Sequence, residues 1–107
     1  MKGWALGLAL TGLLQGSELE LDCAHPGAAG NLIRQARLSD IEWAEDVNRE
    51  AMWEAFGRCP PGPGAEPCRR AHRRDFEADL ERQKEAIREK YRELLRNFLE
   101  RCLASIA

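Results

Sequence analysis

The sequence is poor in the residues from which most catalytic sites are built. It has only two histidines, His25 and His72, and neither has partners at a spacing typical of a metal site or a catalytic set. There is no Gly-rich phosphate loop, and none of the three serines has a base close to it in sequence. We therefore expect no catalytic residues, no cofactor and no bound metal, and we expect both histidines to lie at the surface.

An excess of charge of one sign is also absent. The 107 residues include 16 Lys and Arg against 18 Asp and Glu, so the formal net charge at pH 7 is −2. Nucleic-acid-binding domains are usually basic overall, so this balance argues against a nucleic-acid partner. With 44% hydrophobic and 32% charged residues the chain can fold as one domain. A domain of this size builds a small core, however, and often needs covalent staples.

The sequence has no long hydrophobic run outside its N-terminus. Within residues 1–16, Lys2 precedes an uncharged, mostly apolar run, which is typical of a secretory signal peptide. The run is too short to cross a bilayer, which takes about 20 apolar residues. We predict a signal peptide at 1–16, a mature domain at 17–107 and a secreted or periplasmic location. The alternative is a buried N-terminal helix or strand of a cytosolic protein.

Glycine and proline are missing from residues 68–106, where nearly every residue is a good helix former. Apolar residues recur there at steps of three, four or seven, which predicts one long helix with a single apolar stripe. The stripe consists of Phe76, Leu80, Ile87, Tyr91, Leu94, Phe98, Cys102 and Ile106. Acidic-to-basic pairs three residues apart follow the opposite face, and each stabilises an exposed helix by ~0.2–0.5 kcal/mol. These pairs are Asp79–Arg82, Glu81–Lys84, Glu85–Arg88, Glu89–Arg92 and Glu93–Arg96.

A shorter helix is predicted before the long one. Residues 31–38 can form two helical turns, and Ser39 and Glu42 then have the spacing of a capping box. We therefore predict that a helix starts, or restarts, at Asp40. Gly57 is placed to end it.

Two segments are expected to lack helical structure. Residues 58–67 hold four of the five prolines, so we expect a turn there and the start of the long helix just after Pro67. Residues 17–30 contain the turn sequence that begins at His25, and we expect them to form an extended arm.

Four cysteines can pair in three ways. In an antiparallel hairpin, facing residues have nearly constant summed numbers, and this holds for Cys59 with Cys68 and for Cys23 with Cys102. Other pairings would connect opposite ends of a hairpin about 50 Å long, whereas bridged Cα atoms lie within about 7 Å. We predict these nested bridges, in an all-α, disulfide-stapled antiparallel helical hairpin with a long C-terminal helix and an extended N-terminal arm. Structural zinc is the alternative, but its usual Cys-x2-4-Cys pairs are missing.

An arginine cluster occupies the first turns of the long helix. Its members are Arg69, Arg70, Arg73 and Arg74. Positive charge at a helix N-terminus opposes the helix dipole by about 0.3–1 kcal/mol per charge. An anionic partner, such as a sulfated glycan, a lipid headgroup or an acidic protein, would explain the cluster. One alternative is neutralisation by Glu50, Glu54, Asp75 and Glu77, and another is proteolytic processing at the paired arginines.

Large apolar side chains exceed what a narrow two-helix seam needs. Trp43 and Trp53 lie at the margins of the shorter helix, where they either cover a thin core or contact a protein partner. Because the shorter helix covers only part of the long one, Leu95 and Leu99 are expected to lack partners within the chain. The same holds for Leu94, Phe98, Leu103 and Ile106. We expect this apolar overhang to self-associate or to bind a protein.

Three functional hypotheses follow from these features. The first is a small exported non-enzymatic binding protein. The second is an exported structural or assembly factor that dimerises through its long helix. The third is a thiol–disulfide redox protein that uses Cys59 and Cys68, although a redox pair typically presents Cys-x-x-Cys at a helix start. A count of free thiols in the native chain would separate the third from the others.

Overall fold

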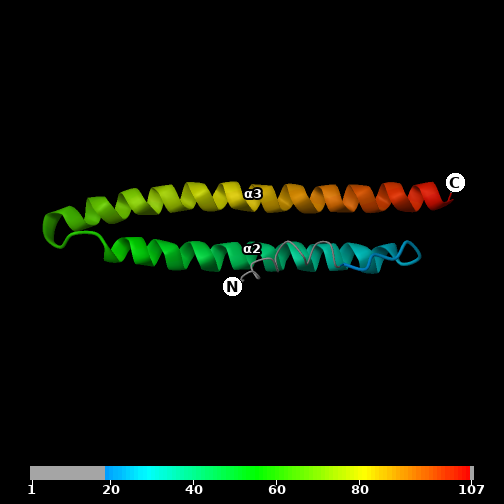
Figure 1. Cartoon of the computed structure of the whole chain (residues 1–107), viewed down its shortest axis with the longest axis horizontal. Coiled ribbons are helices and arrows are strands. Elements are labelled where there is room, and N and C mark those ends of the chain that lie inside the picture. The colour runs from blue at the N-terminus through cyan, green and yellow to red at the C-terminus, as the bar shows by residue number, and fades with distance from the viewer. Residues whose placement is uncertain (1–18, 107) are drawn as a thin grey trace, which may run out of the picture. The chain divides into compact units, whose positions relative to one another are not determined.

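The computed structural model describes residues 19–106, which form two long α-helices joined by a short turn (Figure 1). Helix α2 is Pro26–Gly57 and helix α3 is Ala65–Ile106, with the 3-10 turn η1 at Gly62–Gly64 between them. These described residues contain no strand, so the fold is the predicted all-α antiparallel hairpin with a long C-terminal helix. The predicted signal peptide at 1–16 lies outside the described residues.

Helix α2 begins earlier than predicted. Pro26 is its first residue, a position where the missing N–H costs nothing and the fixed φ favours a helix. The His25 carbonyl accepts the first helical bond, from the amide of Ala29 at 3.1 Å. A turn precedes it, in which the side chain of Asp22 accepts from the Ala24 amide at 2.9 Å and lies 2.9 Å from the His25 ring. The Ala24 amide, and secondarily His25, lowers the pKa of Asp22. The described arm is therefore only 19–25.

The predicted capping box at Ser39 is wrong, because α2 runs through it without a break. Serine and aspartate inside a helix cost at most about 0.7 kcal/mol each relative to alanine. The side chain of Asp40 instead accepts a 2.6 Å hydrogen bond from the Tyr91 hydroxyl of α3. A contact to the partner helix therefore outweighs the local preference for a helix start.

The turn between the helices differs in detail from the prediction. Helix α2 ends at Gly57 as predicted, but the only positive φ angle among the described residues is at Gly62, at 87°. Helix α3 begins at Ala65, so Pro67 lies inside its first turn and not before it. Proline is tolerated there because the first amides of a helix have no intrahelical acceptor.

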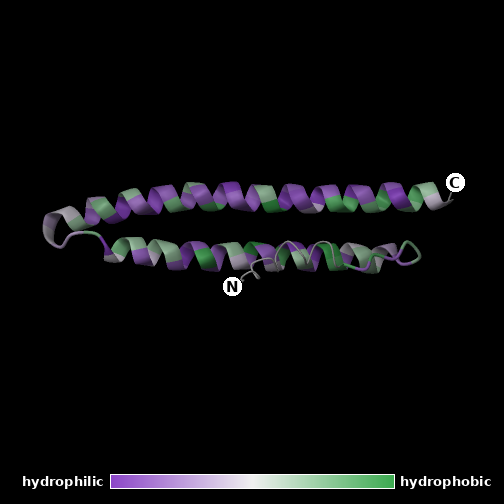
Figure 2. Cartoon of the chain, viewed as in Figure 1, coloured by the Kyte–Doolittle hydropathy of each residue, from purple (hydrophilic) through white to green (hydrophobic). Residues whose placement is uncertain are grey.

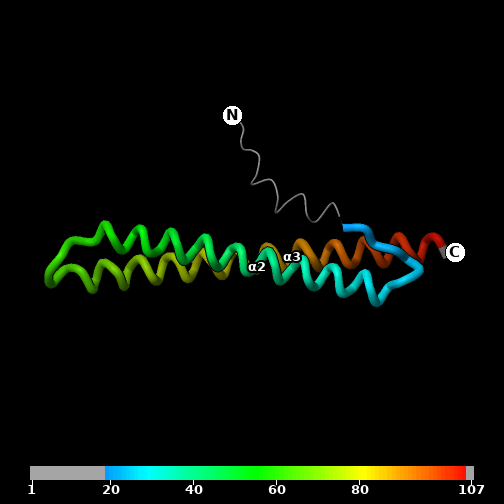
Figure 3. The backbone as a smooth tube through the Cα atoms, turned by 90° about the horizontal axis from the view of Figure 1, so that it is seen from below, coloured from blue at the N-terminus to red at the C-terminus, as the bar shows by residue number. Residues whose placement is uncertain are grey.

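The chain divides into two compact units, each containing part of both helices. Unit 1 combines the described residues up to Asp40 with those from Arg88 onward, where α2 and α3 lie side by side in opposite directions (Figure 3). Its core contains Tyr91 and Phe98, each only 2% exposed, together with Ala29 and Ile33. The predicted bridge Cys23–Cys102 closes this unit, with Cα atoms 5.4 Å apart.

Unit 2 is the segment Ile41–Ile87, and the turn lies within it. Ala44 and Ala55 are buried on α2. The side-chain amide of Asn48 donates to the carbonyl oxygen of Phe76 on α3 at 3.0 Å. The predicted bridge Cys59–Cys68 crosses the turn with Cα atoms 5.8 Å apart, so the nested pairing is confirmed.

Ion pairs form along the surface of α3, and others join α3 to α2. The predicted pairs Asp79–Arg82 at 3.1 Å, Glu93–Arg96 at 3.6 Å and Glu89–Arg92 form on its surface. Lys84 reaches across unit 2 to Glu45 at 2.8 Å, and this hydrogen bond lowers the pKa of that carboxyl group. The pairs on the exposed surface of α3 contribute little stability, because water and salt screen their charges.

Candidate functional sites

A row of three exposed leucines lies on α3 in unit 1. Leu95, Leu99 and Leu103 follow one another at intervals of four residues along α3, so they share one flank of the helix. Their exposed fractions rise along the row from 39% to 46% and 67%. Hydrophobic residues gather in the same C-terminal third of α3 in Figure 2. The row lines a shallow surface depression together with Arg92, Arg96 and Glu100.

This leucine row only partly matches the predicted overhang. Phe98 was expected to lack partners, but it is buried, because α2 begins at Pro26 and supplies Ala29 and Ile33 to the core of unit 1. The side chain of Leu94 is also partly covered. The exposed leucines are therefore a flank of α3 that the hairpin leaves open, and not an end that projects beyond α2.

Both predicted tryptophans are exposed on α2 in unit 2. Trp43 is 65% exposed, and Val47, one turn further on, is 47% exposed. Trp53 is 62% exposed, and the edge of its ring system meets the ring of Phe56 with centroids 5.4 Å apart. Most of the surface of both tryptophans faces solvent, so neither ring mainly covers a thin core. Their role as a protein contact stays a prediction.

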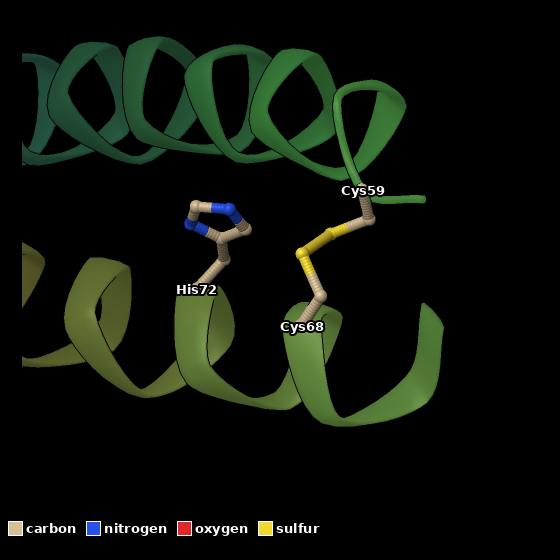
Figure 4. Close-up of side chains that lie close together, drawn as sticks. All are labelled: Cys59, Cys68 and His72. Carbon is tan, nitrogen blue, oxygen red and sulfur yellow. A yellow bond between two sulfur atoms is a disulfide. The ribbon is translucent and has the colours of Figure 1, made fainter. Parts of the chain in front are cut away.

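The turn end of unit 2 brings together three residues of the types that ligate metals, two of them joined in a disulfide. The two sulfur atoms of the Cys59–Cys68 bridge and a ring nitrogen of His72 all lie within 4.8 Å of one another (Figure 4). Cys68 and His72 are four residues apart on α3, so both side chains occupy one face. His72 is partly buried, with its ring centroid 6.4 Å from that of Phe76.

His72 is the residue that the sequence analysis missed, since we expected it to lie free at the surface. The four-residue spacing from Cys68 was visible in the sequence. Both residues also lay within the helix predicted at 68–106, and Cys59 was predicted to bridge to Cys68. The spacing and the predicted bridge together could therefore have placed His72 beside the two sulfur atoms.

The arginine cluster is only partly neutralised. Arg69 pairs with Glu66 at 3.0 Å, and the guanidinium of Arg73 lies 5.5 Å from the centroid of the Phe56 ring. Among residues 19–106, the structure gives Arg70 and Arg74 no ion-pair partner, and both side chains are exposed. In residues 19–106, none of the four acidic residues predicted to neutralise the cluster forms an ion pair with it, and Arg69 pairs with Glu66 instead. An anionic partner for the exposed pair stays a prediction.

Neither helix in the described part of the chain has an apolar stretch that could span a bilayer. No protein-family model, curated protein or solved structure matches the sequence or the fold.

Proposed function

We propose that the protein is a small exported, non-enzymatic interaction protein, and that its docking surface is the leucine row on α3. The observation behind this proposal is the exposure of Leu95, Leu99 and Leu103 on one helix flank. Contiguous exposed apolar side chains on a soluble protein typically mark an interaction surface. An amphipathic helix is the natural occupant, because residues four apart form a ridge that packs into the groove of another helix.

Export is supported by two observations. The pattern of residues 1–16 is typical of a signal peptide. Both cysteine pairs are at bonding distance, and stable disulfides are characteristic of oxidising compartments.

The experiment compares two pairs of leucines in unit 1 that are similarly exposed. The test variant is Leu95→Glu with Leu99→Glu, on the proposed surface. The control is Leu32→Glu with Leu38→Glu on α2, where the two side chains are 43% and 46% exposed. Each variant serves as immobilised bait in the extracytoplasmic fluid or envelope of its source. We expect the α3 variant to lose the proteins that the wild type captures and the α2 variant to keep them. Equal capture by both variants would contradict the proposal.

A second candidate is an assembly factor in which the occupant is another copy of the same chain. The observation that favours it is the charge pattern beside the leucine row. In a two-fold antiparallel pairing centred on Leu99, Leu95 of one copy meets Leu103 of the other. Arg96 and the second copy's Glu100 would then lie about 3 Å apart along the helix axis, at a rise of about 1.5 Å per residue.

Charge exchange tests the self-association directly. Arg96→Glu places two acidic groups against each other at both symmetric positions, so we expect it to weaken the dimer in sedimentation equilibrium. Adding Glu100→Arg restores opposite charges and should restore the dimer. A wild type that stays monomeric at micromolar concentration would eliminate this candidate while leaving a heterologous partner for the leucine row.

A further inference from the structure

We propose that reduction of the Cys59–Cys68 bridge creates a zinc-binding site made of the two thiolates and the imidazole of His72. The three donor atoms already lie within 4.8 Å of one another in the bridged state. Tetrahedral zinc with Zn–S bonds of about 2.3 Å requires its ligand atoms to be about 3.5–3.8 Å apart. The donors thus need only side-chain rotation to reach that spacing once the sulfur–sulfur bond is broken.

The backbone holds two of the donors in fixed positions. Cys68 and His72 project from successive turns of α3, as paired metal ligands on helices commonly do. Cys59 follows the end of α2, where its amide donates to the carbonyl oxygen of Phe56 at 3.0 Å. Figure 4 shows the His72 ring beside the bridge, on the side that faces α2. All three side chains are partly exposed, so a reductant and a metal ion can reach them.

The ligand set and the local charge both fit zinc. Thiolate and imidazole donors suit Zn²⁺ better than the oxygen-preferring Mg²⁺ or Ca²⁺. Two thiolates and a neutral imidazole cancel the charge of the ion, so the site needs no acidic side chain. The arginines that follow Cys68 and His72 in sequence have contacts of their own, Arg69 with Glu66 and Arg73 over the Phe56 ring. Three protein ligands leave one zinc position for water.

Reduction of the Cys59–Cys68 bridge requires a reductant, and a dithiol supplies the electrons and protons. The dithiol transfers two electrons and two protons to the Cys59–Cys68 disulfide and leaves as its own cyclic disulfide. Zinc then displaces the two thiol protons, which pass to the buffer. Metal uptake is consequently coupled to the redox state of the turn bridge, and it is independent of the leucine row in unit 1.

The test uses the full chain, reduced with dithiothreitol and separated from it without oxygen. Co²⁺ replaces Zn²⁺ as the probe, because thiolate-bound cobalt has charge-transfer absorption. We expect the reduced chain to bind one Co²⁺ with thiolate bands, which Zn²⁺ then displaces, and the oxidised chain to bind none. His72→Gln should weaken binding by more than the roughly 10–100-fold lost with an outer-shell partner alone. The matched control is His25→Gln, which removes the histidine of the N-terminal turn and should leave the affinity unchanged.

Cysteine variants separate this site from the second bridge. Cys59→Ser should abolish the thiolate bands, whereas Cys23→Ser should keep them. Far-ultraviolet circular dichroism reports whether each reduced variant is still helical, and the two histidine variants decide the matter if a cysteine variant is not. Reduced wild type without thiolate bands, equal uptake by the oxidised chain, or an unchanged affinity in His72→Gln would each overturn the proposal.

Discussion

The Tyr91 hydroxyl donates a 2.6 Å hydrogen bond to Asp40, and this bond joins α3 to α2 inside unit 1. Tyr91 is only 2% exposed, and the side chain of Asp40 is 13% exposed. The ammonium group of Lys90 completes the cluster, 3.3 Å from the same carboxylate oxygen and 4.9 Å from the centroid of the Tyr91 ring. The local sequence predicts a helix start at Asp40, but in the structure Asp40 lies inside α2 and its side chain belongs to this polar cluster.

The first prediction concerns alkaline pH. Burial, and then the hydrogen bond to Asp40, raises the pKa of Tyr91 above its ordinary value. The folded state therefore disfavours the phenolate. This contribution to the free energy of unfolding is complete below pH of about 10, the ordinary tyrosine pKa, and is lost as pH rises further.

Tyr91 is the only tyrosine, so the phenolate absorbance of the whole chain reports it alone. We expect phenolate formation to coincide with loss of helix in circular dichroism. In Tyr91→Phe, the alkaline decline in stability should be smaller, and the neutral chain should be destabilised by about 1.5–3 kcal/mol, as for a hydrogen bond to a charged group. A phenolate that forms near the ordinary pKa in a fully helical chain would contradict the assignment.

The second prediction compares two glycines. Gly30 lies inside α2, and a Cβ atom added there meets nothing within 4 Å. Gly30→Ala should therefore raise the free energy of unfolding by about 0.5–1 kcal/mol, because alanine is the better helix former. Gly62→Ala is the control and should be destabilising, because the φ angle of +87° disfavours an L side chain. Urea unfolding of the two variants at one pH measures both effects, and equal shifts in the same direction would refute this account.

The third prediction ranks the two bridges. Cys23–Cys102 closes a loop with a sequence separation of 79, whereas the separation for Cys59–Cys68 is 9. Loop entropy alone makes removal of the long-range bridge more destabilising, by about 2 kcal/mol. The matched variants are Cys23→Ser with Cys102→Ser and Cys59→Ser with Cys68→Ser, compared by thermal unfolding. A larger loss in the turn-bridge variant would mean that native packing at the turn outweighs the entropy of the unfolded chain.

The sequence predicted the features that depend on repeated patterns. The apolar periodicity of 68–106 predicted α3, and the register of an antiparallel hairpin predicted both bridges. The errors arose where one local signal was read alone. Ser39 has the spacing of a cap, yet a hydrogen bond from Tyr91, 51 residues from Asp40, keeps the helix continuous. Such a contact has no local signature.

Some residues of the candidate sites could be predicted from the sequence, and others could not. Exposure of Leu95 and Leu99 was predicted from the shortness of the first helix, but α2 is longer than predicted, and the two leucines are exposed because they lie on an open flank of α3. The burial of Phe98 could not be anticipated, since it depends on α2 beginning at Pro26. The position of His72 beside the turn bridge could have been anticipated, because Cys68 and His72 are four residues apart in the predicted helix.

The leucine row is tested most directly by photo-crosslinking from its centre. Leu99 is replaced by photo-leucine, which preserves the shape of the side chain, and the chain is irradiated in its native extracytoplasmic fluid. Leu38 on α2, also 46% exposed, provides the control position. We expect a covalent adduct with another protein chain, whether a different protein or a second copy, from position 99 and much less from position 38. Only solvent-quenched or intrachain products at position 99, or equal yields at the two positions, would contradict the leucine row as the docking surface.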